Sequence, residues 1–165
     1  MIPLPNPGEG GPVAPGPTIP TYPQPNPPCF YCDSSQVGKI RFMNAAYDYG
    51  PFRVYVNRRF IAGELGFGSI TPYGRVSSGY QTVTITGDDG YIYLQKPMPI
   101  NAGDLATIAI IRRAGGLDLL KISDLSCNAA GTSCLRASNL AYDSGPLDLV
   151  LYDGRVVFSD IRYKE

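Results

Sequence analysis

The chain of 165 residues is 44% hydrophobic, and its 14 basic residues balance its 14 acidic ones. This length suits one ordinary domain with appendages, and the even charge without a basic run excludes the electrostatic footprint of a nucleic-acid-binding protein. The sequence contains no histidine, which removes the commonest general base and the commonest metal ligand. We therefore expect no enzymatic activity, no cofactor and no bound metal.

Residues 1–31 form a proline-rich arm that contains most of the 16 prolines. Because proline lacks a backbone N–H and fixes φ, this composition predicts an extended, polyproline-like or disordered segment. The arm is either a flexible leader or a docking arm that becomes ordered on a neighbouring subunit. Its first residues have neither a basic region nor a continuous apolar run, so we expect no secretory signal peptide. We also expect no transmembrane segment, because no apolar stretch approaches the ~20 residues that span a bilayer.

From Lys39 onward the pattern becomes one of short β-strands. Residues 39–45 (KIRFMNA) and 52–57 (FRVYVN) are rich in β-branched and aromatic side chains, and residues 80–87 (YQTVTITG) alternate between polar and apolar. Further apolar segments follow, separated by the turn signals GDDG, NAGD and RRAGG, at residues 91–96, 105–111 and 117–123. No long segment has a 3.6-residue period. We predict an all-β fold: an antiparallel β-sandwich of the immunoglobulin-like or Greek-key type.

The chain also contains an internal repeat. The stretch IRFMNAAYDYGPFRVYVN (40–57) returns as LRASNLAYDSGPLDLVLY (135–152), an offset of 135 − 40 = 95 positions. Asn44 aligns with Asn139, Cys32 aligns with Cys127, and after a one-residue slip Leu65 aligns with Ile161. We interpret residues 32–126 as a first β-sandwich unit and residues 127–165 as an incomplete second unit.

These residues resemble the domain-of-unknown-function 4397 family, a β-sandwich module often found in tandem in bacterial and archaeal surface proteins. Its opening strand reads approximately [VI]-R-[FV]-x-[NH]-A, followed by a short acidic turn with proline and a D-V-Y-V-like strand, which residues 40–57 match. Residues 79–87 resemble a later strand of the family. The chain departs from the pattern at Arg53, where an acid is usual, whereas Asp148 in the second unit keeps the acid.

The resemblance implies a sandwich fold and an extracytoplasmic or cell-surface location. It implies no reaction, since the family has no established catalytic residues. The proline-rich leader with cysteines but without a signal peptide resembles versions from spore-forming Gram-positive bacteria, in which spore-surface proteins need no signal. We therefore expect a cell-surface or spore-surface protein; cytoplasmic synthesis without classical secretion stays open.

The four cysteines, Cys29, Cys32, Cys127 and Cys134, allow several interpretations. A zinc site would need all four thiolates, and the six residues between Cys127 and Cys134 exceed the usual ligand spacing. A thioredoxin-like site would need its C-x-x-C at a helix N-terminus, whereas this one follows the proline-rich arm. Disulfides within or between the two junctions, or between chains, are favoured, and reduced thiols are the remaining alternative.

The candidate binding residues are Asn44, Tyr47, Asp48, Tyr49 and Tyr55. The asparagine and aspartate would form part of a polar pocket, and the tyrosines would offer stacking faces to a sugar. In the structural alternative, the Asn and Asp side chains accept backbone hydrogen bonds in a turn. The repetition of this turn favours the structural interpretation, because a fold needs its turn in every copy.

These observations predict a non-enzymatic structural or adhesion module that associates with itself or with another surface protein. The alternative is a β-sandwich that recognises carbohydrate or another ligand through some of its 12 tyrosines. The incomplete second unit is either the trace of a truncated two-unit protein or a functional device. In the second case it packs on the first unit or offers unpaired strands to a partner.

Overall fold

The computed structural model describes residues 36–124, 131 and 133–165. The predicted arm (1–31) and three of the cysteines, Cys29, Cys32 and Cys127, lie outside the described residues. The described part of the chain contains ten β-strands and no helix. In these residues there is consequently no helix long and apolar enough to cross a membrane.

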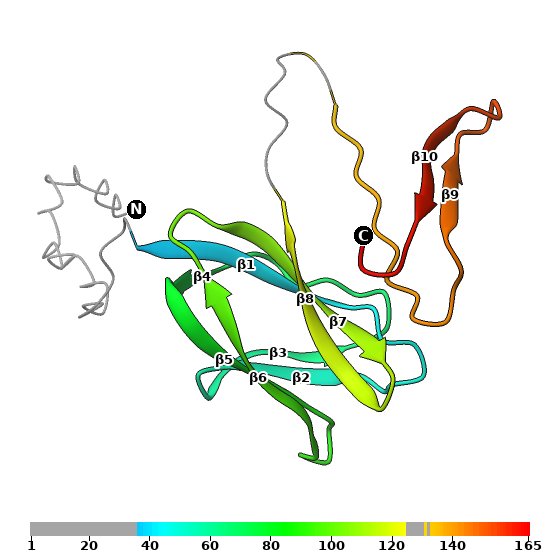
Figure 1. Ribbon diagram of the computed structural model, residues 1–165. Coiled ribbons are helices and arrows are strands. Elements are labelled where there is room, and N and C mark those ends of the chain that lie inside the picture. The colour runs from blue at the N-terminus through cyan, green and yellow to red at the C-terminus, as the bar shows by residue number, and fades with distance from the viewer. Residues whose placement is uncertain (1–35, 125–130, 132) are drawn as a thin grey trace, which may run out of the picture. The chain divides into compact units, whose positions relative to one another are not determined.

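Eight strands form the two sheets of a β-sandwich (Figure 1). One sheet has the order β4-β1-β7-β8 and the other the order β3-β2-β5-β6. The strands are β1 (Val37–Asn44), β2 (Phe52–Val56), β3 (Arg59–Leu65), β4 (Gly74–Ser77), β5 (Gly79–Thr86), β6 (Ile92–Ile100), β7 (Leu105–Arg113) and β8 (Gly116–Ser123). The predicted all-β sandwich is confirmed. One pairing differs from a purely antiparallel pattern, because β1 runs parallel to β7.

The core lies between the two sheets and follows from the alternation of side chains along each strand. In β2, for example, Phe52, Val54 and Val56 are buried, whereas Arg53 between them is exposed. The buried cluster draws aliphatic and aromatic residues from both sheets. Burial of each such side chain contributes about 1.5–3 kcal/mol, which makes this core the main source of stability.

Strand β7 is buried on both of its faces. Ile108 and Ile110 belong to the core between the sheets. Ala109 and Ile111 point to the opposite face of the sheet, because side chains alternate along a strand, and yet they are fully buried too. The C-terminal part of the chain lies near this outer face, since the hydroxyl of Tyr163 donates a hydrogen bond to the carbonyl oxygen of Arg112.

Two further strands, β9 (Leu147–Val150) and β10 (Val156–Ile161), form a separate two-stranded antiparallel sheet. Their register repeats that of β2 and β3 at the sequence offset of the repeat. The equivalent pairs are Leu147↔Ile161 for Phe52↔Leu65, Leu149↔Phe158 for Val54↔Ala62, and Val150↔Val156 for Tyr55↔Phe60. Both hairpins also have an acidic residue in the left-handed backbone conformation at the same position, with φ of 51° at Glu64 and 57° at Asp160. The sequence repeat is therefore also a repeat of local structure.

Candidate functional site

The repeated asparagine ties a turn to a hairpin in both copies. In the first copy the Asn44 side-chain Nδ2 donates to the Leu65 carbonyl at 2.9 Å, and its Oδ1 accepts the Ala46 N–H at 2.9 Å. Asn44 is fully buried. Its amide is thus satisfied inside the fold and is not open to a ligand.

The equivalent asparagine makes the same contacts. The Asn139 Nδ2 donates to the Ile161 carbonyl at 3.1 Å, and its Oδ1 accepts the Ala141 N–H at 3.0 Å. Ile161 is the residue that aligns with Leu65. These matched contacts support a structural role for the asparagine in both turns.

The remaining candidate binding residues lie in separate contacts. The rings of Tyr47 and Phe67 meet edge-on with centroids 5.7 Å apart, and Tyr142 and Tyr163 repeat this pair at 5.6 Å. Asp48 has a φ of 68° and a carboxylate oxygen 3.6 Å from the Arg112 guanidinium.

The other two tyrosines contact different aromatic neighbours. Tyr49 packs edge-on against Tyr93 at 5.6 Å, and Tyr55 packs on Phe60 at 5.6 Å. Tyr49 also contacts Phe52. The three tyrosines singled out from the sequence therefore pack against different aromatic neighbours and do not converge on one platform.

The fourth cysteine, Cys134, is disulfide-bonded. The other cysteines in the sequence lie outside the described residues. Among the described residues, no group of three Cys, Asp or Glu side chains gathers where it could hold a metal ion.

A groove of about 580 Å³ lies between the outer face of the β1-containing sheet and the C-terminal part of the chain. The sheet contributes apolar side chains such as Met43 and Ile122, and the C-terminal part contributes Leu135, Ala137 and Phe158. In the repeat, Leu135 and Ala137 align with core residues of β1. On its C-terminal side the groove is thus lined in part by residues whose counterparts, Ile40 and Phe42, belong to the first core.

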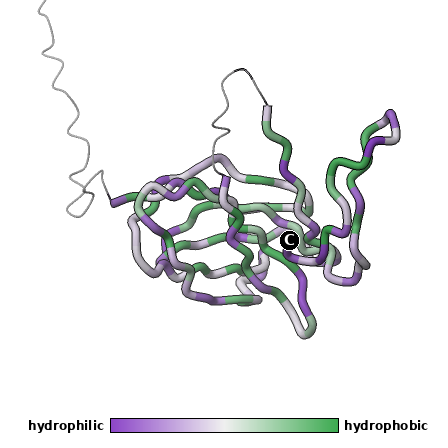
Figure 2. The backbone as a smooth tube through the Cα atoms, turned by 45° about the horizontal axis from the view of Figure 1, so that its top comes forward, coloured by the Kyte–Doolittle hydropathy of each residue, from purple (hydrophilic) through white to green (hydrophobic). Residues whose placement is uncertain are grey.

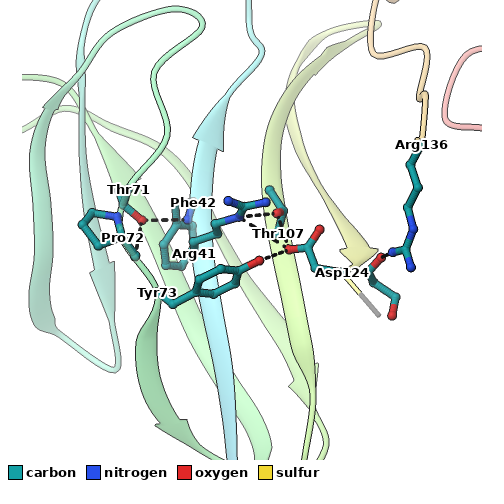
Figure 3. Close-up of polar contacts among 9 residues, drawn as sticks. Arg41, Phe42, Thr71, Pro72, Tyr73, Thr107, Asp124 and Arg136 are labelled. Atoms are coloured by element: carbon teal, nitrogen blue, oxygen red, sulfur yellow. Dashed lines mark hydrogen bonds and ion pairs between the residues drawn. The ribbon is translucent and has the colours of Figure 1, made fainter. Parts of the chain in front are cut away.

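A polar cluster lies at this groove and joins β1, β7 and the end of β8 (Figure 3). The Arg41 Nε donates to the Thr107 Oγ1 at 2.9 Å and lies 3.5 Å from the Asp124 carboxylate. Thr107 and Tyr73 both donate to that carboxylate, at 2.6 and 2.7 Å. The Arg41 guanidinium also covers the Tyr73 ring, 4.6 Å from its centroid.

The two charged groups of the cluster, Arg41 and Asp124, are paired with each other, and Asp124 also accepts hydrogen bonds from Tyr73 and Thr107. Burial raises the pKa of Tyr73, and its hydrogen bond to Asp124 raises it further, so the phenol stays protonated as a donor. Arg136, the repeat counterpart of Arg41, donates to the Ser123 carbonyl beside the cluster. The chemistry of these groups therefore indicates a structural tie. Sequence reasoning did not single out this cluster, although the repeated arginine was a signal for it.

The β9–β10 hairpin differs from its β2–β3 counterpart in what surrounds it. Strand β2 lies between β3 and β5, whereas β9 pairs with β10 and with no other described strand. Phe52 is fully buried, but its counterpart Leu147 is 46% exposed. Val56 is 5% exposed, and its counterpart Leu151 is 39% exposed. Figure 2 shows hydrophobic stretches along this hairpin.

The sequence model of a protein family described as "Domain of unknown function (DUF4397)" matches residues 38–150, more than half of the chain. The chain belongs to the DUF4397 family. The match runs from β1 into β9, and so spans the whole sandwich and the first strand of the second hairpin. A search of curated proteins found no match. Family membership was predicted from the opening strand and is confirmed.

One carboxylate ties the two sheets of the DUF4397 sandwich to the C-terminal part of the chain. Asp118 in β8 lies 2.6 Å from the Lys96 ammonium in β6 and 3.2 Å from that of Lys164. It also accepts the Leu119 N–H at 2.8 Å. Burial raises the pKa of Asp118, but the hydrogen bonds from Lys96, Leu119 and Lys164 outweigh burial and lower the pKa from 3.8 to about 2.

We expect this DUF4397 protein to lose roughly 1–2 kcal/mol of unfolding free energy through Asp118 between pH 5 and pH 2. Because the folded-state pKa is lowered, the ionised carboxylate stabilises the fold above pH 4, and this stabilisation is lost as the pH falls toward 2. Urea unfolding of the wild type and Asp118→Asn at pH 5 and pH 2.5 measures the effect. The substitution should cost stability at pH 5 and much less at pH 2.5, whereas Asp88→Asn at an exposed ion pair should cost little at either pH. An equal cost of Asp118→Asn at both pH values would contradict the prediction.

Proposed function

We propose that this DUF4397 protein is a non-enzymatic structural or adhesive module of a cell or spore surface and acts by assembly with other polypeptide chains. The observation that carries the proposal is the β9–β10 hairpin. It repeats the register of β2–β3, but its apolar side chains stay exposed and the outer edge of β9 has no strand beside it among the described residues. An exposed strand edge next to apolar side chains is a template for pairing with another chain.

Three observations support the non-enzymatic and surface parts of the proposal. The sequence offers no histidine for acid–base chemistry, and in the polar cluster at the groove Arg41, Thr107 and Asp124 hold one another. Cys134 is disulfide-bonded, and disulfides persist in oxidising, extracytoplasmic settings. A structural protein at a surface needs a stable scaffold and a contact surface, and the sandwich and the hairpin provide these two parts.

Light scattering on the purified chain, over a range of concentrations and with or without reductant, tests the assembly function. We expect species larger than a monomer whose size rises with concentration. Leu149→Lys should reduce them, because Leu149 aligns with the core residue Val54 and a charge on this apolar side of β9 opposes apolar contact. Tyr152→Lys is the matched control, since it adds the same charge at a fully exposed position.

The response to reductant separates two routes of assembly. If the large species dissociate when reductant is added, disulfides between chains hold them together. If reductant does not change their size, strand pairing holds them together. A strictly monomeric chain at all concentrations, in both conditions, would overturn the proposed function.

A further inference from the structure

The free edge of β9 carries backbone groups arranged for strand pairing. The Leu151 N–H donates to the Arg155 carbonyl just before β10. Successive N–H groups along a strand point to opposite edges, so the N–H groups of Asp148 and Val150 point away from β10. The first hairpin uses this edge: the Asn57 N–H, on the equivalent side of β2, donates to the Thr82 carbonyl of β5.

The first hairpin also indicates that a strand like β5 would not pair with the free edge of β9. Strand β5 lies beside β2, and the Arg53 side chain pairs with Asp88 at 3.1 Å. Asp148 aligns with Arg53, so a strand like β5, together with the turn that follows it, would bring the Asp88 carboxylate to that of Asp148 and place like charges together. Strand β5 of any second copy is also already held between β2 and β6.

Strand β9, in contrast, is complementary to itself. We infer that the β9 edge binds β9 of a second copy of this chain, antiparallel, around a two-fold axis at Leu149. This register sets Leu149 opposite its own counterpart and Leu147 opposite Leu151 of the second copy, so these three leucines of each copy meet on one face of the paired strands. It also sets Asp148 opposite Val150, and no acid faces an acid.

The backbone groups fit the same register. Asp148 and Val150 are the two residues whose N–H and C=O groups point to the free edge, and in this arrangement they face one another across the axis. The pair of strands then forms about four backbone hydrogen bonds, as expected for an antiparallel ladder of this length. The Asp148 carboxylate is held by the Asp160 N–H at 2.8 Å and does not need to move. The contact is isologous and closed.

The inference rests on the proposed assembly function and adds that the partner is a second copy of this chain. An interface of one short strand per copy lies at the small end of specific interfaces, so pairing is expected to be weak in dilute solution. At a surface, where copies are held side by side, the effective concentration rises and weak contacts become occupied.

Disulfide trapping in the full chain tests the register. With Leu149→Cys, mild oxidation should give a covalent dimer, and peptide mass mapping should find position 149 linked to position 149. Leu147→Cys is the matched control and should give at least ~5-fold less dimer through its new thiol, because its counterpart lies several residues away along the strand. Mixing Leu147→Cys with Leu151→Cys should restore a cross-link between the two different chains.

A backbone test complements the trapping. Adding Val150→Pro to Leu149→Cys removes an edge N–H and should abolish the dimer, whereas adding Val150→Thr keeps the N–H and should preserve it.

Equal trapping at positions 147 and 149 would overturn the inference. A labelled peptide of residues 79–89, which comprises β5 and the following turn with Asp88, that binds the chain without any link at position 149 would overturn the inference in favour of a β5-like occupant. Multimers that never link through 149 would also overturn this interface, while leaving the assembly function intact.

Discussion

Phe52→Ala is expected to lower the unfolding free energy of the sandwich by about 3–5 kcal/mol. The ring of Phe52 is fully buried between the sheets and contacts the rings of Tyr49 and Tyr93 at centroid distances of 6.0 and 5.8 Å. Alanine would remove these contacts and leave a cavity that the two sheets close only in part, because their spacing is set by the remaining core residues. Urea unfolding followed by circular dichroism measures the loss.

The repeat provides a matched control for this substitution within the same chain. Leu147 occupies the equivalent position in the β9–β10 hairpin but is 46% exposed. Leu147→Ala should therefore cost less than about 1 kcal/mol in dilute solution, because little surface is uncovered. Similar costs for the two substitutions would mean that the second hairpin has a core of its own, and would contradict our description of its exposed face.

The strands that could be predicted from sequence are those whose side chains alternate or form apolar runs. Residues 52–57 and 80–87 alternate because one face of each strand lies in the core. Residues 105–111 are apolar except for Thr107 and do not alternate, and the structure gives the reason: this part of β7 is covered on both faces. Strand β4 was not predicted, because its sequence GRVS has a single large apolar residue and the strand forms by pairing with β1 at the sheet edge.

The parallel pairing of β1 with β7 could not be predicted, since nothing local specifies which distant strand lies beside another. Arg41 and Thr107, which hydrogen-bond across this pair, are 66 positions apart. The polar cluster at the groove was missed for the same reason, because its members come from separate segments that only the fold brings together. A repeated arginine in the sequence indicates a constraint, but it does not identify the carboxylate that satisfies it.

The repeated turn was better predicted than the cluster, because its contacts are mostly local. The Asn44 Oδ1 accepts a hydrogen bond from the residue two positions later, a pattern typical of asparagine in turns. The contact of its Nδ2 with the Leu65 carbonyl is long-range and was not predicted; the structure shows it in both copies, at Leu65 and at the aligned Ile161. Repetition within one chain thus supplied information that a single copy lacks.

Asn44→Ala is expected to destabilise the sandwich by about 2–4 kcal/mol, because it leaves two buried backbone groups without a partner. These are the Ala46 N–H and the Leu65 carbonyl oxygen, both of which bond to the Asn44 amide at 2.9 Å. Water does not readily replace the lost amide, since both Asn44 and Ala46 are fully buried. Chemical unfolding of the variant at neutral pH measures the cost.

Asn139→Ala makes the same change in the second copy and separates local from global effects. Asn139 bonds to the Ala141 N–H and to the Ile161 carbonyl, but it holds a hairpin outside the main core. We therefore expect little change in the unfolding of the sandwich and a clear loss of hydrogen-exchange protection at the Ala141 N–H. If Asn44→Ala leaves stability unchanged, the buried amide does not fix the turn, and a ligand-binding role for Asn44 would have to be considered again.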